Sequence, residues 1–273
     1  MILENKKGII FGALDEHSLA WKVAKRCMEE GASIVLSNTE IAAQLGNITQ
    51  IATESNIPFI TCDATSISDL QSVFIESQRI LGGKIDFVLH SIAQSQNLRR
   101  HKRYDEINYD YFVRTIDISA MSFHKMVQTA MDLDAMASNG SIVTFTYIAS
   151  ERYFEGYNDM ADAKALLESF VRQLGAIYGK KKGVRINAIS QSAVPTRAGG
   201  QWEDMDFFYR YANDLSPLGS ATSEECADLC VALFSDLTRK VTMQTIYNDG
   251  GFSKTMLTRD LMQDFKIHTI GTI

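Results

Sequence analysis

The sequence comprises 273 residues, of which 45% are hydrophobic, and its formal net charge is −6. This length suits one α/β domain with a large core, and an acidic balance without a single-sign tail argues against nucleic-acid binding. No run of about 18 apolar residues occurs, so we expect no membrane span. The four cysteines form no CxxC pair and no metal-binding pattern, which is typical of a reduced, cytoplasmic protein.

Apolar runs and helical patterns alternate along the chain. The sequence predicts strands at 7–14, 33–37, 58–62, 85–91, 140–145, 184–190 and 244–247. It predicts helices at 18–30, 40–54 with a possible break at Gly46, 66–81, 109–136, 157–178 and 223–233. Continuous apolar strands indicate a parallel sheet covered on both faces. We therefore expect residues 1–273 to form a single α/β domain around a doubly wound, Rossmann-like sheet of seven strands.

A long irregular stretch, residues 191–222, follows the sixth predicted strand. Loops of that length in a compact domain usually have a function, often as lids. Its middle part, 202–211, carries aromatic and acidic residues at helical spacing. We expect a substrate lid here that contains a short, mobile helix.

Tyr157 and Lys164 are seven residues apart in the predicted helix 157–178. Two helical turns span about seven residues, so we expect both side chains on one face. Tyr147 follows the fifth strand, at the edge where open α/β sheets bind ligands. A phenol beside an ammonium suits polarisation of a substrate carbonyl, and the positive charge is expected to lower the pKa of the phenol. Taken alone, the pair is also consistent with an ordinary helix face.

Gly12 closes the first strand, and the turn after it leads into a helix with Ser18 as the expected N-cap. A glycine lets the backbone approach a pyrophosphate, and a helix N-terminus attracts anions. The turn lacks the second and third glycines of GxGxxG, so it is equally consistent with an ordinary strand-to-helix connection.

The third and fourth strands end at Asp63 and at 91–93, where an adenine and a nicotinamide ribose would lie across a doubly wound sheet. Asp63 is suited to accept a hydrogen bond from an adenine amino group. Alternatively, it caps the helix that is expected to start near Ser66.

The region after the second strand bears on the choice of cofactor. No lysine or arginine occurs between Arg26 and Arg79, whereas a 2′-phosphate requires a cation nearby. The sequence therefore favours NADH over NADPH. The usual acidic residue at the strand end is also missing, and Asn38 is the candidate partner for a ribose hydroxyl.

Several motifs fall in order along nearly the whole chain: Gly12 with Ser18-Leu19-Ala20, Cys62-Asp63, His90-Ser91-Ile92, Tyr147, Tyr157-x6-Lys164, Arg185 to Ser190, and Asp249-Gly250-Gly251-Phe252-Ser253. Together they resemble the bacterial enoyl-acyl carrier protein reductases, a divergent branch of the short-chain dehydrogenase superfamily. The x6 spacing is the specific part, because most of that superfamily has Tyr-x3-Lys. Ala161 stands where that lysine would be.

The resemblance implies NADH-dependent reduction of the trans-2 double bond of an enoyl thioester on acyl carrier protein, in fatty acid synthesis, by a homotetramer. Tyr157 would bond the thioester carbonyl and stabilise an enolate, and Lys164 would hold the nicotinamide ribose. The substrate contacts expected are Ser95, Tyr147 and Tyr157. The cofactor contacts expected, from the residues and the resemblance together, are Gly12, Ser18, Leu19, Asn38, Asp63, Ala64, Ser91, Ile92, Ala93, Lys164, Val194 and Thr196.

Four features depart from the family pattern. Asp15 and Glu16 put negative charge in the phosphate turn, Ala93 replaces a glycine, Asp162 replaces an apolar residue, and 190–193 lacks a Pro-Gly pair. Two alternatives therefore stay open. One is a short-chain reductase for another activated alkene or carbonyl, and the other is a non-catalytic dinucleotide-binding or scaffold protein.

A dense basic run, residues 99–103, follows the fourth strand on the rim of the expected site. Acyl carrier proteins are acidic, so we hypothesise that this run helps to dock the carrier, with Arg100 and Arg103 as the residues to test. A solvated loop without a partner is the alternative.

Overall fold

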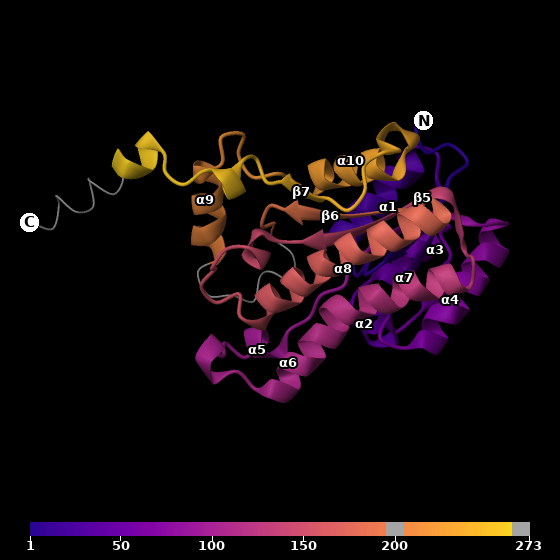
Figure 1. The fold of residues 1–273 in the computed structure, drawn as a ribbon, viewed down its shortest axis with the longest axis horizontal. Helices are drawn as coiled ribbons and strands as arrows, with labels where there is room; N and C mark the ends of the chain where they lie inside the picture. The colour runs from indigo at the N-terminus through magenta and orange to yellow at the C-terminus, as the bar shows by residue number, and fades with distance from the viewer. Residues whose placement is uncertain (195–204, 264–273) are drawn as a thin grey trace, which may run out of the picture.

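The computed structural model describes residues 1–194 and 205–263, and over these residues seven strands form one parallel sheet in the order β3-β2-β1-β4-β5-β6-β7 (Figure 1). The strands are β1 (Lys7–Phe11), β2 (Ser33–Asn38), β3 (Phe59–Thr61), β4 (Ile85–His90), β5 (Met136–Thr146), β6 (Arg185–Gln191) and β7 (Thr245–Asn248). The predicted doubly wound, seven-stranded α/β sheet is confirmed.

Helices cover both faces of the sheet. They are α1 (Leu19–Glu29), α2 (Glu40–Leu45), α3 (Ile48–Glu54), α4 (Ile67–Leu81), α5 (Gln96–Arg99), α6 (Tyr109–Ile116), α7 (Ser122–Asp132), α8 (Asp159–Lys182), α9 (Met205–Leu215) and α10 (Ser223–Phe234). Successive strand residues point to opposite faces. Ile10 therefore joins the core with α1 and α10, whereas its neighbour Ile9 joins the core with α4, α7 and α8. None of the described helices has the length and apolar character to cross a membrane.

The strand order reverses between β1 and β4, and ligands of such sheets bind where the order reverses, beyond the carboxyl ends of the strands. Gly12 brings the two strand ends together. Its φ is 96°, its N–H donates to Ser37, and a Cβ there would lie 2.0 Å from the carbonyl oxygen of Ser91. β1 accordingly ends at Phe11, whereas the apolar run predicted that it would continue to residue 14.

The predicted break at Gly46 is confirmed, because α2 ends at Leu45 and α3 begins at Ile48. A Cβ on Gly46 would lie 2.0 Å from the carbonyl oxygen of Leu14. The break therefore lets the α2–α3 pair pack directly against the turn between β1 and α1.

The predicted helix 109–136 is too long. α6 continues through a π-helical turn, η2 (Asp117–Met121), into α7, which ends at Asp132. Asp134 then takes a left-handed φ of 49°, and β5 begins at Met136 rather than at 140. Apolar periodicity continued across this turn, so it could not indicate where the helix stops.

The predicted helix 157–178 also begins and ends later, as α8 runs from Asp159 to Lys182. Asn158 has a φ of 54°, and its Oδ1 accepts from the N–H of Asp159 at 2.8 Å, which starts the helix there. Tyr157 therefore precedes α8. The expectation that Tyr157 and Lys164 share a helix face is wrong.

Candidate functional site

Tyr147 and Tyr157 meet through ring packing. Tyr147 follows β5, and its ring centroid lies 5.2 Å from that of Tyr157 and 5.5 Å from that of Phe154. The ring of Phe154 contacts Phe208 of α9, with 4.8 Å between centroids. The loop before α8 and the helix α9 thus enclose the two tyrosines in one aromatic cluster, which comprises these four residues.

Lys164 reaches the same strand end from α8. Its side chain is buried, with 6% of the residue surface exposed, and its Nζ donates to the carbonyl oxygen of Phe145 at 2.8 Å. Burial lowers the pKa of this ammonium to about 8, and the negative charge of Glu168 partly opposes that shift. The structure therefore attaches Lys164 to Phe145 of β5, which is two residues before Tyr147. Lys164 and Tyr157 nevertheless share no helix face, because Tyr157 precedes α8.

The pKa of Tyr157 is raised above its ordinary value by burial, not lowered by Lys164 as we expected. Burial also raises the pKa of Tyr147, with the charges of Tyr157, Tyr209 and Asp249 adding to the effect. Desolvation disfavours a phenolate, and the Lys164 ammonium is bonded to a backbone carbonyl. Both phenols therefore keep their protons at neutral pH and are hydrogen-bond donors.

A buried carboxylate fixes the start of α8 beside Tyr157. Asp159 is fully buried, and its two oxygens accept from Ser95 Oγ at 2.5 Å and from Asn97 Nδ2 at 2.8 Å. Asn97 in turn accepts from the N–H of Asn108 at 2.9 Å. Ser95, a predicted substrate contact, thus uses its hydroxyl proton within the fold.

The neighbouring residues of α8 extend this clamp. Asn158 Nδ2 donates to the carbonyl oxygen of Lys102, and Tyr104 donates to the carboxylate of Asp162 at 3.1 Å. Asp162, one of the departures from the family pattern, therefore ties the chain just after the basic run 99–103 to α8. Figure 1 shows α5 at this end of α8.

The turn between β1 and α1 is held by its own side chains. Leu14 N–H donates to Ser18 Oγ at 3.3 Å, His17 N–H donates to Asp15 Oδ1 at 3.0 Å, and Ser18 Oγ donates to the Asp15 carbonyl oxygen at 2.7 Å. Ser18 occupies the predicted N-cap position without capping by its side chain. Asp15 is buried and structural. The first N–H groups of a helix have no intrahelical acceptor, so Leu19 and its successor remain suited to an anion.

Asn38 is committed to the same turn. Its Nδ2 donates to the carbonyl oxygen of Ala13 at 2.9 Å, and its Oδ1 accepts from the N–H of Thr39. The predicted ribose partner therefore braces the phosphate turn with its side chain.

Asp63 is exposed and accepts from the N–H and hydroxyl of Thr65. The alternative that Asp63 caps α4 is wrong, because the cap is Ser66, which accepts from the N–H of Asp69. Ala64 is buried next to it. Three predicted cofactor contacts follow β4. Ser91 and Ile92 are half-buried, and Ala93 is exposed.

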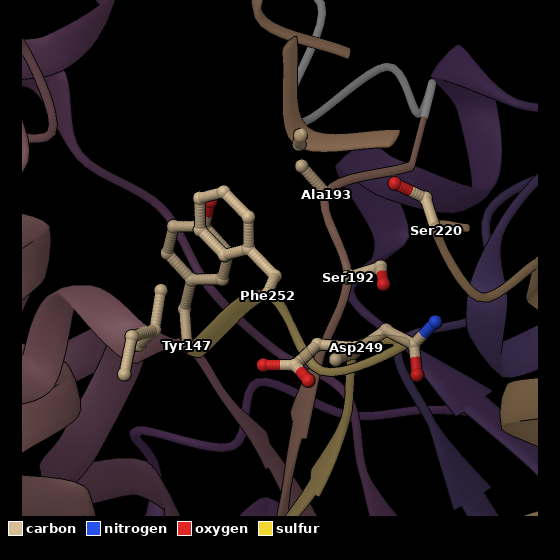
Figure 2. A pocket seen from close by; sticks show the side chains of 9 residues that line it. Tyr147, Ser192, Ala193, Ser220, Asp249 and Phe252 are labelled. Atoms are coloured by element: carbon tan, nitrogen blue, oxygen red, sulfur yellow. The ribbon is translucent and has the colours of Figure 1, made fainter. Parts of the chain in front are cut away.

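A pocket of about 230 Å³, part of it open to solvent, lies beyond β5, β6 and β7 and beside α9. Figure 2 shows Tyr147 and Phe252 on one side of it, Ser192 and Ser220 on the other, and Asp249 below. The remaining lining residues are Ile148, Gln191, Ala193 and Ala212. The helix predicted within the lid is present as α9, although residues 195–204 of the lid lie outside the described residues.

Val194, a predicted cofactor contact, is half-buried and accepts from the hydroxyl of Tyr209 at 3.0 Å. Thr196 lies outside the described residues. Side-chain bonds fasten the loop that lacks the Pro-Gly pair. Gln191 Nε2 donates to Ala221 at 3.3 Å, and Ser192 Oγ accepts from the N–H of Ala221 at 2.9 Å.

Sequence reasoning gave no role to three buried polar residues of the site, Asp159, Glu168 and His90, although His90 is part of a quoted motif. His90 contacts Thr144 through Nδ1 and Ser122 through Nε2, and burial, with the charge of Lys164, lowers its pKa to about 3. Glu168 could have been found, since it follows Lys164 by one helical turn. Nothing in the sequence pairs Asp159 with Ser95.

The chain matches a family model described as "Enoyl-(Acyl carrier protein) reductase" over residues 12–253. It is 34% identical to an enoyl-[acyl-carrier-protein] reductase [NADH] of Rhizobium meliloti, over 94% of each chain. It is 32% identical to the corresponding NADH enzyme of Enterococcus faecalis, over 92% of this chain and 98% of that one.

Among solved structures, the chain resembles a FabI–NADH complex from Alistipes finegoldii. The TM-score is 0.94 and the sequence identity is 51%, over 96% of this chain and 93% of that one.

Replacing Asp159 tests the clamp on Tyr157. Asp159→Ala leaves a buried hydroxyl and a buried amide without their acceptor, so we expect the free energy of unfolding in urea to fall by about 2–4 kcal/mol. Asp162 lies one helical turn after Asp159 and accepts from the exposed Tyr104. Asp162→Ala should therefore change the free energy of unfolding by less than about 0.5 kcal/mol. Equal effects of the two variants would contradict the buried network.

Proposed function

The chain belongs to the family of enoyl-(acyl carrier protein) reductases, and we propose that it reduces the trans-2 double bond of an enoyl thioester with NADH. The observation that carries this proposal is the buried Lys164 bound to the end of β5, beside the packed pair of Tyr147 and Tyr157. Relatives whose names specify the same reaction and cofactor favour it over another reductase or a non-catalytic protein.

The residues present fit a nicotinamide dinucleotide. An ammonium has three donors, of which Phe145 accepts one, so Lys164 has donors for the ribose hydroxyls. The start of α1 at Leu19 suits the pyrophosphate. Gly12 and the end of β4, at Ser91 to Ala93, approach closely enough to form the floor of the crevice. When bound, NADH supplies the hydride that reduces the β-carbon.

Tyr157 supplies the chemistry that the protein itself contributes. Because burial keeps its phenol protonated, it donates a hydrogen bond to the thioester carbonyl oxygen. Negative charge develops on that oxygen as the enolate forms, so the bond strengthens in the transition state. Tyr147 holds the ring of Tyr157 in place by packing, and the low polarity of the aromatic cluster strengthens the bond further.

NADH rather than NADPH is the proposed cofactor. The chain has no lysine or arginine between Arg26 and Arg79, so neither β2 nor α2 carries a cation for a 2′-phosphate. Asp63 and Ala64 stand at the end of β3, where the adenine would lie, as sequence reasoning expected.

We extend the proposal to the whole chain. Residues 1–273 act as one dinucleotide-binding domain with a substrate lid at about 191–222, in which α9 with Phe208 covers Tyr157 through Phe154. Ser95, Val194 and Thr196 keep the substrate and cofactor roles that the family pattern implies. The proposed location is the cytoplasm, and the proposed oligomeric state is a homotetramer.

Substitution of the two central residues tests the mechanism. Tyr157→Phe removes the donor to the developing oxyanion and should lower kcat with crotonyl thioester by roughly 10²–10³-fold. Lys164→Ala should also weaken NADH binding, by about tenfold or more, because a charged hydrogen bond is lost. The assay follows NADH oxidation by absorbance.

Tyr153→Phe is the matched control, since its phenol lies in the same loop but is 86% exposed. It should leave kcat unchanged. Full activity in the Lys164→Ala variant would refute the role proposed for that residue.

The proposed carrier surface is the basic run 99–103. Its residues are exposed, and the bonds from Asn158 to Lys102 and from Tyr104 to Asp162 hold it beside the start of α8. Arg103 is paired with Asp105 at 2.6 Å, so part of its charge is neutralised locally. Arg99 and Arg100 are therefore the better residues to test.

Reversing these charges should separate carrier-bound from free substrate. In the double variant Arg99→Glu/Arg100→Glu, KM for an enoyl-acyl carrier protein should rise by about tenfold, because steering of an acidic partner is lost. KM for crotonyl thioester should not change. Arg79→Glu is the control, because Arg79 belongs to α4, which Figure 1 shows apart from α5. An equal rise in KM for both substrates in the double variant would contradict the proposed docking surface.

A further inference from the structure

Glu168 is a buried carboxylate one helical turn beyond Lys164, with only 4% of its surface exposed. Its Oε1 accepts from Thr146 Oγ1 at 2.6 Å and from Ser150 Oγ at 2.6 Å. A carboxylate taken out of water needs hydrogen bonds and a nearby cation to remain charged. The two hydroxyls supply the bonds, and Lys164, four residues earlier on the same helix face, is the cation.

The two residues that bond Glu168 lie on either side of Tyr147. Thr146 ends β5, and Ser150 ends the short helical turn η3 (Ile148–Ser150) that follows Tyr147. Lys164 bonds Phe145, the residue before Thr146. One face of α8 therefore holds the segment 145–150 at three points, and Tyr147 lies within the held segment.

From these contacts we infer that Glu168 is a positioning residue that acts in two ways: its hydrogen bonds fix the turn that carries Tyr147, and its charge keeps Lys164 protonated. The functional meaning of this inference rests on the proposed reductase activity, because Tyr147 and Lys164 are the residues through which Glu168 would act. Glu168 itself is not required to touch substrate or cofactor.

The charged and titratable groups around this pair come from several elements. His90 of β4 faces Lys164, but its lowered pKa keeps it neutral at physiological pH. The raised pKa values of Tyr147 and Tyr157 keep both phenols neutral as well.

Burial raises the pKa of Tyr247 of β7, as does the hydrogen bond that its hydroxyl donates to Glu151 at 2.6 Å, and the charge of Glu168 adds to this effect. Asp249 is a further carboxylate near these groups, because its charge adds to the effect of burial on the pKa of Tyr147. Of the groups named here, Lys164 is the one whose pKa, about 8, lies close to physiological pH.

The charge of Glu168 sets the pH at which Lys164 loses its proton. Lys164 is charged below its pKa and becomes neutral as the pH rises through it. Burial lowers that pKa, and the negative charge of Glu168 opposes the shift. Neutralising Glu168 therefore lowers the pKa of Lys164 further, and Lys164 loses its proton at a lower pH than in the wild type.

The decisive experiment follows Lys164 itself. The full-length protein carries lysine labelled with carbon-13 at Cε, and NMR spectra are recorded between pH 6 and 10 for the wild type, Glu168→Gln and Glu151→Gln. Lys164→Arg identifies the resonance. In Glu168→Gln we expect the midpoint of Lys164 to fall by roughly 1–2 pH units. Glu151→Gln, the same chemical change at an exposed neighbour of Ser150, should not move it. A midpoint unchanged in Glu168→Gln overturns the electrostatic role.

Ser150→Ala tests the positioning role separately and covers the case in which Glu168→Gln does not fold. This variant keeps the charge of Glu168 and removes one hydrogen bond to the Tyr147 turn. We expect kcat with crotonyl thioester to fall by about three- to tenfold, with the Lys164 midpoint unchanged. An unchanged kcat overturns the positioning role.

The same measurements keep the two proposals apart. NADH affinity, measured by fluorescence titration over the same pH range, should decline in the wild type as Lys164 loses its proton and should decline at lower pH in Glu168→Gln. If the NMR midpoint shifts but the wild type neither binds NADH nor reduces crotonyl thioester, the proposed function fails and the electrostatic link between Glu168 and Lys164 stands.

Discussion

The site depends on the attachment of α8 to the carboxyl end of β5. Lys164 donates to Phe145 at 2.8 Å, and Glu168 accepts from the residue that ends the strand. One bond reaches the backbone of the strand and the other the side chain of Thr146, so the helix and the strand end are tied together at two points. The Tyr147 turn is held at this junction, whereas the start of α8 is fixed separately by Asn158 and by the bonds of Asp159.

Burial rather than attraction between charges sets the chemistry of the two tyrosines. The sequence predicted that Lys164 would lower the pKa of the Tyr157 phenol, yet burial raises it. A protonated phenol is the better partner for a carbonyl that becomes negative, because it starts as a donor and its bond strengthens with the charge. The aromatic surroundings thus support the role proposed for Tyr157, and the cofactor is the partner proposed for Lys164.

The departures from the family pattern have structural uses in this chain. Asp15 accepts within the phosphate turn, Gln191 and Ser192 fasten the loop that lacks Pro-Gly, and Asp162 accepts from Tyr104. None of these contacts removes a residue proposed for chemistry. Three of the four departures therefore take part in local hydrogen bonds, and nothing in the structure explains Ala93.

Apolar runs were enough to predict the sheet, because the central strands β1, β4 and β6 are almost wholly buried and read as continuous segments. Except for β1, the strand ends were predicted to within one residue, and with them the positions of Tyr147, Ser91 and Asp63. Most helix starts were predicted to within one residue, but that of α8 was not, because the left-handed Asn158 places it after Tyr157. Contacts between distant residues, such as Ser95 with Asp159, left no periodic signal, and pKa directions depended on burial that only the fold determines.

A crystal structure of the protein with NADH and an enoyl thioester analogue tests the central claim most directly. The account predicts that the nicotinamide ribose hydroxyls lie within hydrogen-bond distance, about 2.7–3.2 Å, of Lys164 Nζ, and that the thioester carbonyl oxygen faces the hydroxyl of Tyr157. A nicotinamide bound away from the end of β5, with the space above Lys164 filled by side chains, would contradict it.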